Sequence, residues 1–309
     1  MNKDLILGID TSNYKTSIAV VDYDGNILVN DSKLLDVPKG EKGLRQSDAF
    51  FKHSNDLPNM LFKVLNDEEI RKNIKRVSVS TRPRSVEGSY MPVFRAGENA
   101  AVIMSSALGV PLRRFSHQEG HIKAIKEYSD IKNKDKFIAY HLSGGTTEAL
   151  LVNNGKIEII GGTKDIAIGQ LIDRVGVKLG MDFPAGKEMD KIATCNEALI
   201  NPTAVRLDEG FFNLSGIETQ CMKAIEGNLA NEMIPGMFKA IAELLINETK
   251  YLSDRYLIND FIFTGGVSSS EFIRSYLPGK VEANIYFGAP ELSGDNAVGI
   301  ALLGGTNNG

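Results

Sequence analysis

Two of the chain's four histidines, His117 and His121, lie four residues apart within the segment FSHQEGHIKA. Four residues make about one helical turn, so on a helix both imidazoles would share one face and could supply half of a metal site. Glu119 lies between them, but the zinc-protease pattern H-E-x-x-H places its glutamate directly beside the first histidine. We therefore expect no protease base here. The histidines alone leave open a metal site or an unrelated pair on the surface.

Three further segments combine hydroxyl or amide side chains, two of them with paired glycines. They are DTSNYKT at residues 10–16, SGGTT at residues 143–147 and TGGVSSS at residues 264–270. Glycine lets the backbone approach a ligand closely, and hydroxyls donate to anionic oxygens. The third segment is expected to run into a helix, whose amino end favours phosphate. Each segment alone is more typical of an ordinary turn, but three at the ends of strands favour a nucleotide site in a cleft.

The elements that must position these residues follow a pattern that occurs twice. Each half begins with a strand, a polar turn, a second strand, a hairpin and a third strand, and continues with helices. In the first half the strands are expected at residues 4–10, 17–22 and 26–35, and in the second half at residues 137–142, 148–153 and 156–162. The repetition predicts two related α/β lobes.

The composition is that of an ordinary globular protein of 309 residues, 42% hydrophobic and 24% charged. The net charge of −4 argues against a strong grip on nucleic acid by this chain alone, since clustered Lys and Arg drive phosphate binding. The two cysteines, Cys195 and Cys221, provide no disulfide framework, so we expect a cytoplasmic protein. No apolar run is long enough for a signal peptide or a membrane helix.

The order of these motifs resembles the TsaD/Gcp family, the catalytic subunits of tRNA threonylcarbamoyl transferase, formerly classed as glycoproteases of peptidase family M22. The family's E-T-S-x-D-D-T appears as DTSNYKT, its H-x-E-x-H as HQEGH, and its S-G-G-H-T as SGGTT. Its G-E-A-F-D-K…Y-P-G-G appears as GQLIDRVGVKLGMDFPAG and its F-S-G-L-K-T as LSGIET. Its G-G-G-V-x-x-N appears as TGGVSSS, and its closing D-N-A begins at Asp295. The match extends from Ile6 to Leu303.

The resemblance implies the two-lobed actin–Hsp70–sugar-kinase (ASKHA, ribonuclease H-like) fold, an α/β fold with a cleft between lobes. We expect residues 1–115 with 290–309 to form the first lobe and residues 116–289 the second. It also implies one divalent metal, iron or zinc, with Asp295 joining the two histidines, and a bound ATP or adenylate intermediate. The implied metal ligands are His117, His121 and Asp295. The implied substrate- or nucleotide-binding residues are Asp10, Ser12, Ser143, Gly144, Gly145, Thr146, Thr147, Asp173, Gly186, Asp190, Gly265, Gly266 and Ser270. No side chain is assigned as catalytic.

Several positions depart from the family pattern. Arg82 and Arg84 stand where a T-x-G-P-G segment would have glycines, either as charges on a solvent-facing loop or as a new contact for an anion or partner. Lys15 stands where the family has an acid, Gln170 replaces a glutamate, and Ser270 replaces an asparagine. The SGGTT loop also lacks the family's histidine. These changes predict a divergent paralogue whose metal and nucleotide framework is kept.

The implied activity is metal-dependent transfer of a threonylcarbamoyl-type group from its adenylate to an adenosine of tRNA. Because the chain is acidic, partner subunits are expected to help hold the tRNA, and a TsaB-like subunit or a second copy of the chain is the expected partner. One alternative is an ATP-binding enzyme of the same fold with a different acceptor. Another is a non-catalytic partner subunit, which would have no need of the three metal ligands.

Overall fold

The computed structural model describes residues 3–12, 14–38, 43–227 and 229–306. The chain divides into two compact units. The first comprises Met1–Asp36, Leu44–Tyr128 and Asp295–Gly309, and the second comprises Val37–Gly43 and Ser129–Gly294. Among the described residues, no helix has the length and apolar character needed to span a bilayer.

The described part of the first unit contains a five-stranded sheet in the order β3-β2-β1-β4-β5. Its strands are β1 (Leu5–Asp10), β2 (Lys15–Asp22), β3 (Ile27–Leu34), β4 (Ile74–Arg82) and β5 (Leu112–Ser116). β1 pairs antiparallel with β2 and parallel with β4, and β4 pairs parallel with β5. The carboxyl ends of β1, β4 and β5 therefore meet at one edge, which brings Asp10, Arg82 and Ser116 to that edge.

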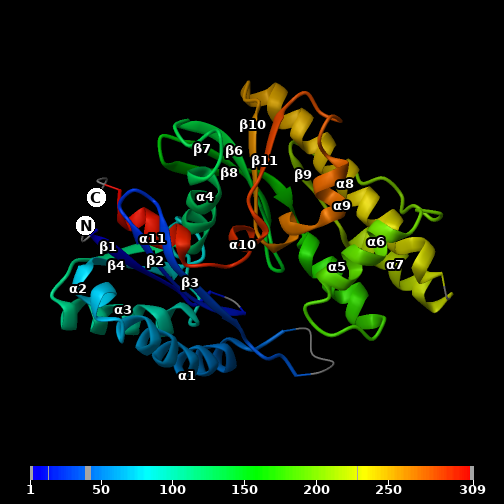
Figure 1. Cartoon of the computed structure of the whole chain (residues 1–309). Coiled ribbons are helices and arrows are strands. Elements are labelled where there is room, and N and C mark those ends of the chain that lie inside the picture. Colours follow the sequence, from blue (N-terminus) through cyan, green and yellow to red (C-terminus); the bar gives the residue numbers. More distant parts are fainter. Residues whose placement is uncertain (1–2, 13, 39–42, 228, 307–309) are drawn as a thin grey trace. The chain divides into compact units, whose positions relative to one another are not determined.

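Helices cover this sheet on both faces. They are α1 (Gln46–Leu65), α2 (Glu68–Asn73), α3 (Phe94–Leu108), α4 (His117–Glu127) and α11 (Val298–Gly304). Figure 1 shows α1 and α3 on one face and α11 with α4 on the other. The core between the sheet and α1 and α3 is aliphatic, with fully buried Leu7, Ile9 and Val79. All six residues of β1 are buried, because helices cover both of its faces.

Two close contacts fix α11 against its neighbours. A Cβ built at Gly8 of β1 would lie 2.5 Å from the carbonyl oxygen of Ala297 and 2.8 Å from the Cβ of Ala301. A Cβ built at Gly299 would collide with the carbonyl oxygen of Gly120 in α4. Only glycine at these positions allows the backbones to approach so closely. The turn that holds Asp295 is thereby held between β1 and α4.

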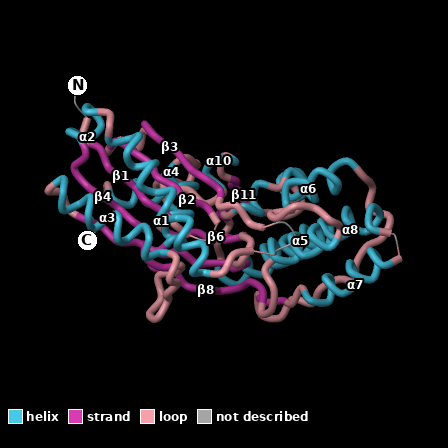
Figure 2. The backbone as a smooth tube through the Cα atoms, turned by 90° about the horizontal axis from the view of Figure 1, so that it is seen from below, coloured by secondary structure: helices cyan, strands magenta, loops and turns pink. Residues whose placement is uncertain are grey.

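The described part of the second unit contains a six-stranded sheet in the order β11-β10-β6-β7-β8-β9. Its strands are β6 (Lys136–Leu142), β7 (Thr147–Asn153), β8 (Lys156–Thr163), β9 (Phe211–Phe212), β10 (Asp260–Thr264) and β11 (Asn284–Phe287). Its helices are α5 (Ile168–Lys178), α6 (Gly186–Cys195), α7 (Ser215–Glu226), α8 (Ala230–Tyr256), η1 (Gly266–Ser269), α9 (Glu271–Tyr276) and α10 (Pro290–Ser293). Figure 2 shows α5, α6, α7 and α8 packed beside one another.

The sequence patterns predicted most of these elements. Helix α3 ends at Leu108 because Gly109, the residue after it, adopts the left-handed conformation with φ 66°. One difference is that the third polar segment enters the short 3-10 helix η1 before α9 begins. The LSGIET motif, residues 214–219, forms the start of helix α7. Short elements such as α2 and β9 offer too few residues for a periodic pattern to be recognised.

The long helix α8 buries a carboxyl group in the second unit. The side chain of Glu248 is fully buried, and a Cβ built at Gly161 of β8 would lie 2.6 Å from its Oε1. Burial raises the pKa of Glu248 well above its usual value, although hydrogen bonds from Tyr140 and the Gly162 backbone oppose the shift. The carboxyl group is therefore neutral in the folded protein at pH values where it ionises in the unfolded chain.

A Glu248→Gln variant is expected to be more stable than the wild type in alkaline solution, with the advantage shrinking as the pH falls. Because the folded-state pKa is raised, the contribution of Glu248 to stability is complete below its unfolded pKa and is lost as pH rises toward the folded pKa. The loss has a slope of about 1.4 kcal/mol per pH unit, and an isosteric amide removes it. Urea unfolding at pH 4.5 and pH 8 measures the effect. An advantage that is the same at both pH values would contradict the assignment.

Candidate metal centre and nucleotide-binding turns

The helix that carries the two histidines begins with a reciprocal cap. The Ser116 hydroxyl accepts a hydrogen bond from the Glu119 N–H at 3.2 Å, and the Glu119 carboxylate accepts one from the Ser116 N–H at 2.7 Å. This capping box fixes the first turn of α4 at His117. Glu119 thus caps the helix, a role that its position in the sequence did not predict.

The imidazoles of His117 and His121 converge with the carboxylate of Asp295 within the first unit. Their Nε2 atoms are 2.9 Å apart, and they lie 3.3 Å and 3.2 Å from Asp295 Oδ1, respectively. The side chain of His121 is 1% exposed and that of Asp295 is 19% exposed, so the group is largely shielded but reachable from solvent. Two imidazole nitrogens and one carboxylate oxygen thus lie around one point. They belong to the three residues that the family resemblance implies as metal ligands.

Asp10 lies behind the first histidine. Its Oδ1 is 3.2 Å from His117 Nδ1, while the hydroxyls of Ser12 and Ser80 both donate hydrogen bonds to its carboxylate, that of Ser12 at 2.6 Å. Asp10 is fully buried at the end of β1. A carboxylate on Nδ1 keeps the proton there and directs the Nε2 lone pair toward the centre, as is usual for metal-binding histidines. The structure therefore places Asp10 and Ser12 on the Nδ1 side of His117, whereas Asp295 lies on its Nε2 side.

The charges in this cluster stabilise one another. Burial opposes the charged form of His117, but the charge and hydrogen bond of Asp10, together with Asp295, raise its pKa. Burial opposes ionisation of Asp295 and Asp10, yet the histidines lower the pKa of Asp295, and His117 lowers that of Asp10. Burial and the charge of His117 lower the pKa of His121. Without a metal the cluster thus holds two carboxylates, a protonated His117 and a neutral His121, and a bound cation would take the place of the His117 Nε2 proton.

This donor set fits a divalent transition metal. Two imidazoles and one carboxylate suit iron or zinc and leave coordination positions for substrate oxygens. His117 and His121 lie one turn apart on the rigid, capped helix α4, and Asp295 precedes α11, which is packed closely against that helix. The residues that would hold the ion are therefore His117, His121 and Asp295, with Asp10 orienting the first.

An Asp10→Asn variant is expected to bind Zn²⁺ or Fe²⁺ about 10–100-fold more weakly than the wild type, because it loses the carboxylate that orients His117. Isothermal titration of the metal-free protein measures the affinity, and circular dichroism checks the fold. Asp31→Asn, on strand β3 of the same sheet, is a matched control that should leave the affinity unchanged. Equal affinities for Asp10→Asn and the wild type would contradict the role of Asp10.

Two of the predicted turns come together in the second unit. β10 pairs parallel with β6, and Thr264 is in register with His141, so the segments that follow both strands lie side by side. A Cβ at Gly265, whose φ is 88°, would collide with the carbonyl oxygen of Leu142, directly before Ser143. Within the SGGTT turn, the N–H of Thr146 donates to the Ser143 hydroxyl at 3.1 Å. The hydroxyl of Thr147 accepts from the N–H of Ile168 at 2.8 Å, which ties the turn to α5.

Asp173 of α5 lies beside this pair of turns. Its Oδ2 would be 3.9 Å from a Cβ at Gly144, and its Oδ1 accepts a hydrogen bond from the Ala185 N–H at 2.9 Å. Burial raises the pKa of Asp173 to about 6, although the backbone N–H groups of Ala185 and Gly186 oppose the shift. A carboxyl group with this pKa can accept a hydrogen bond from a ligand hydroxyl at neutral pH.

Asp190 and Ser270 contact each other. The Ser270 hydroxyl donates to the Asp190 carboxylate, which also accepts hydrogen bonds from the N–H groups of Glu271 at 2.7 Å and Phe272 at 3.3 Å. The Ser270 hydroxyl in turn accepts from the N–H of Ile273, as the cap of α9. Both residues lie in the second unit as expected, but their polar groups serve the start of α9.

Four candidate glycines leave open space beside the backbone. A Cβ at Gly145, Gly186 or Gly266 would meet nothing within 4 Å, and one at Gly144 would meet only Asp173. None of the four has a positive φ angle, so alanine fits each backbone without strain. The main chain at these four glycines is therefore open to close approach.

Gly145→Ala and Gly266→Ala are each expected to retain the wild-type melting temperature but to weaken nucleotide binding by about tenfold or more, because the added methyl group occupies the space of a ligand atom. Titration with an ATP analogue and a thermal melt provide the two readings. Gly265→Ala is the contrasting variant and should lower the melting temperature, since its φ of 88° and its contact with Leu142 exclude a side chain. Unchanged nucleotide binding in the first two variants would remove the turns from the ligand site.

Sequence reasoning missed Ser80, the second hydroxyl on Asp10. It lies in β4, parallel to β1, and its only signal was a serine near the end of an alternating strand. It also missed that the neighbouring Arg82 guanidinium lies 3.8 Å from the Glu119 carboxylate of the capping box. Both contacts depend on strand register, which the sequence does not specify residue by residue.

A family model described as "TsaD: tRNA N6-adenosine threonylcarbamoyltransferase" matches residues 36–302. The chain belongs to the TsaD family. A relative of that name from Thermosipho melanesiensis is 30% identical, and the alignment covers 97% of this chain and 94% of the relative. One from Methanopyrus kandleri is 28% identical, with coverages of 97% and 86%. The resemblance found in the motifs is confirmed, and the relatives are transferases by name.

Solved structures with the same fold confirm the expected architecture. The structure of HypF from T. kodakarensis superposes with a TM-score of 0.64 at 14% identity, covering 98% of this chain and 48% of that one. A ROK family glucokinase from Streptomyces griseus gives a TM-score of 0.52 at 14% identity, with coverages of 97% and 99%. At these identities the likeness establishes the fold alone, which is the α/β fold of the actin–Hsp70–sugar-kinase group.

Proposed function

We propose that this TsaD family member transfers a threonylcarbamoyl group from its adenylate to an adenosine of tRNA, with a divalent metal and an adenine nucleotide bound. The observation that carries the proposal is the convergence of His117, His121 and Asp295 on one point. The relatives named for the tRNA reaction support the acceptor. The open backbone at Gly145 and Gly266 supports the nucleotide.

The chemistry is an acyl transfer to nitrogen. The N6 amino group of the tRNA adenine attacks the carbamoyl carbon of the mixed anhydride and forms a new carbon–nitrogen bond. The bond from that carbon to the phosphate oxygen breaks, AMP leaves with the electron pair, and the nitrogen loses one proton to solvent. The transfer needs an oriented acyl group and a stabilised leaving group more than it needs a strong base.

Each cluster of residues contributes one part of this requirement. The metal, when bound, acts as a Lewis acid that holds and polarises the threonylcarbamoyl group. Asp10 keeps His117 in one orientation, so the donor set is preorganised before substrate arrives. Backbone N–H groups of the SGGTT and TGGVSSS turns offer donors to the phosphate oxygens of the leaving group. Asp173 accepts hydrogen bonds from ligand hydroxyls.

Partner subunits are part of the proposal. The net charge of −4 leaves this chain poorly suited to hold a whole tRNA alone. Helices α1 and α3 carry exposed apolar side chains, with Phe51 64%, Phe62 71% and Ile103 66% exposed. Large apolar groups of this kind are typical of docking surfaces. We propose that a TsaB-like subunit, or a second copy of the chain, covers this face.

One observation favours an alternative acceptor or ligand. The carboxylate of Asp190 is engaged by the Ser270 hydroxyl and by two backbone N–H groups at the start of α9. Asparagine stands at the position of Ser270 in the family pattern, where it was expected to touch the ligand. An ATP-binding paralogue with a different acceptor is therefore the second candidate. A non-catalytic subunit is less well supported, because it has no need of a preorganised donor set.

Complementation of a strain that lacks its housekeeping threonylcarbamoyl transferase tests the acceptor. The wild-type chain, supplied with its partner subunit, is expected to restore modified adenosine in hydrolysed tRNA, as measured by mass spectrometry. His121→Ala should reduce the modification by at least about 100-fold, because a donor of the metal site is removed. Lys123→Ala, on the same helix, replaces a partly exposed side chain paired with Glu127 and should retain the activity.

The outcomes separate the candidates. Wild-type chain that binds nucleotide but leaves the tRNA unmodified would support the paralogue with another acceptor. Full activity in His121→Ala would overturn the metal-dependent chemistry while leaving the tRNA acceptor in place. A folded chain that binds neither metal nor nucleotide would support the non-catalytic subunit.

A further inference from the structure

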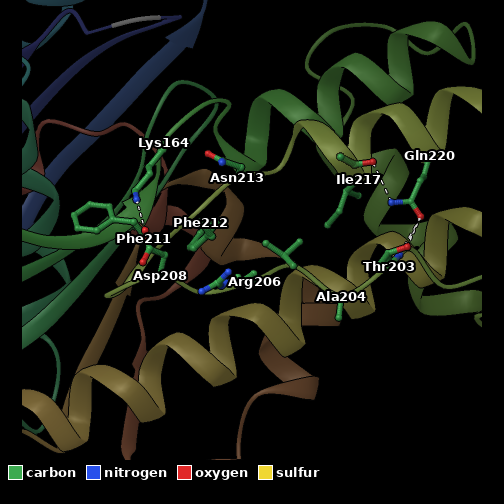
Figure 3. Close-up of a pocket in the computed structure, with 12 residues that line it drawn as sticks. Lys164, Thr203, Ala204, Arg206, Asp208, Phe211, Phe212, Asn213, Ile217 and Gln220 are labelled. Carbon is green, nitrogen blue, oxygen red and sulfur yellow. Dashed lines mark hydrogen bonds and ion pairs between the residues drawn. The ribbon is translucent and has the colours of Figure 1, made fainter.

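A groove of about 570 Å³ lies in the second unit, formed by residues that no part of the proposed chemistry uses. Its walls come from the end of β8, the segment before β9, and the first turns of α7. Figure 3 shows Lys164, Asp208 and Arg206 on one side and Thr203 with Gln220 on the other. Phe212 and Ile217, which are 2% and 1% exposed, form an apolar floor. The walls are largely exposed, so the groove is open along its length.

One side of the groove carries two positive groups, Lys164 and Arg206, and they differ in whether a carboxylate pairs with them. The Lys164 ammonium is 2.8 Å from the Asp208 carboxylate and 5.7 Å from the centre of the Phe211 ring. Among the described residues, no hydrogen bond or ion pair engages the guanidinium of Arg206, although its charge helps Lys164 to lower the pKa of Asp208. Arg206 therefore faces the groove with its planar set of donors available.

The surrounding carboxylates are already bound. Asp165 accepts hydrogen bonds from the N–H groups of Leu214 and Ser215 at the start of α7, and Glu218 pairs with Arg174. Exposed Glu209 does not line the groove. Arg206 is thus the one lining cation, within the described residues, that no carboxylate neutralises by contact. An anionic group entering the groove meets it first.

The remaining polar groups suit a planar heterocycle. The Gln220 side chain accepts from the N–H and hydroxyl of Thr203 at 3.0 and 3.2 Å and donates to Gly216, which fixes the loop to α7. The Asn213 side chain is exposed at the groove and makes no hydrogen bond with the described residues. An amide can pair with the edge of a base, and the partly exposed Phe211 ring can stack on its face.

We propose that this groove binds a nucleotide unit within a single-stranded segment of the acceptor RNA, with the phosphate on Arg206, the base edge on Asn213 and the base face on Phe211. The assignment rests on tRNA as the acceptor. An open groove with one cation, one amide and one aromatic ring matches the way proteins bind unpaired RNA strands. A closed pocket would be needed to bury a free nucleotide to the extent usual for small ligands.

Affinity for tRNA, measured by fluorescence anisotropy at several salt concentrations, tests the groove in the full chain with its partner subunit. Arg206→Ala is expected to weaken binding on the order of threefold to tenfold and to reduce the slope of log K against log salt by roughly 0.7, the change for one phosphate contact to a single strand. Asn213→Ala should weaken binding without changing the slope. Arg206→Lys should retain the wild-type slope, because the positive charge is kept. Lys156→Ala, at the start of β8, is the matched control and should bind tRNA as the wild type does.

Each outcome decides a separate claim. Suppose that the wild type binds and modifies tRNA and that Arg206→Ala binds it equally well with an equal salt slope. The proposal that the groove binds RNA would then be wrong, and the proposed function would stand. Wild type that neither binds nor modifies tRNA would remove the proposed function itself. Titration with AMP and with a short single-stranded oligonucleotide distinguishes the source of the nucleotide. Arg206-dependent binding of AMP without any binding of the oligonucleotide would overturn the RNA assignment.

Discussion

The close packing of α11 against β1 and α4 is the constraint on which the candidate metal centre depends. Gly8 and Gly299 allow main chains to approach to distances that any side chain would prevent. This packing brings Asp295 into contact with His117 and His121, which lie more than 170 positions earlier in the chain. The capping box on α4 and the carboxylate of Asp10 then fix the orientation of the imidazoles. Backbone packing thus sets the positions of the donors, and hydrogen bonds set their directions.

The second unit uses the same kind of backbone proximity for a different purpose. Gly265 lies against Leu142, so the turns after β6 and β10 adjoin, while Gly145 and Gly266 keep the space beside them open. Glycines in these turns therefore have two effects: Gly265 lets two main-chain segments touch, and Gly145 and Gly266 leave the main chain open. Ser270 departs from the family pattern at a position where the side chain now caps a helix.

The sequence predicted the large elements and the donor set but not the supporting contacts. The three strands that open each half, β1 to β3 and β6 to β8, were visible as apolar runs separated by turn residues. His117 and His121 were found by their spacing, and Asp295 only through the resemblance to a family. Ser80 and Arg82 were not recognised as supporting residues, because Ser80 contacts Asp10 on the neighbouring strand and Arg82, at the end of β4, contacts Glu119 of α4. Such contacts depend on register and on three-dimensional packing, for which a single sequence has no local signal.

The order in which the donors appear along the chain also affects when the centre can be completed. The two imidazoles are translated well before the carboxylate of Asp295, which follows them by more than 170 residues. Until α11 has folded back onto β1 and α4, a nascent chain presents only a pair of histidines, which hold a divalent ion much more weakly than a full set of three ligands. If the centre holds the proposed metal, tight capture would therefore be a late event that depends on the completion of the first unit. A cell that controls metal supply would thereby act on the finished fold and not on its intermediates.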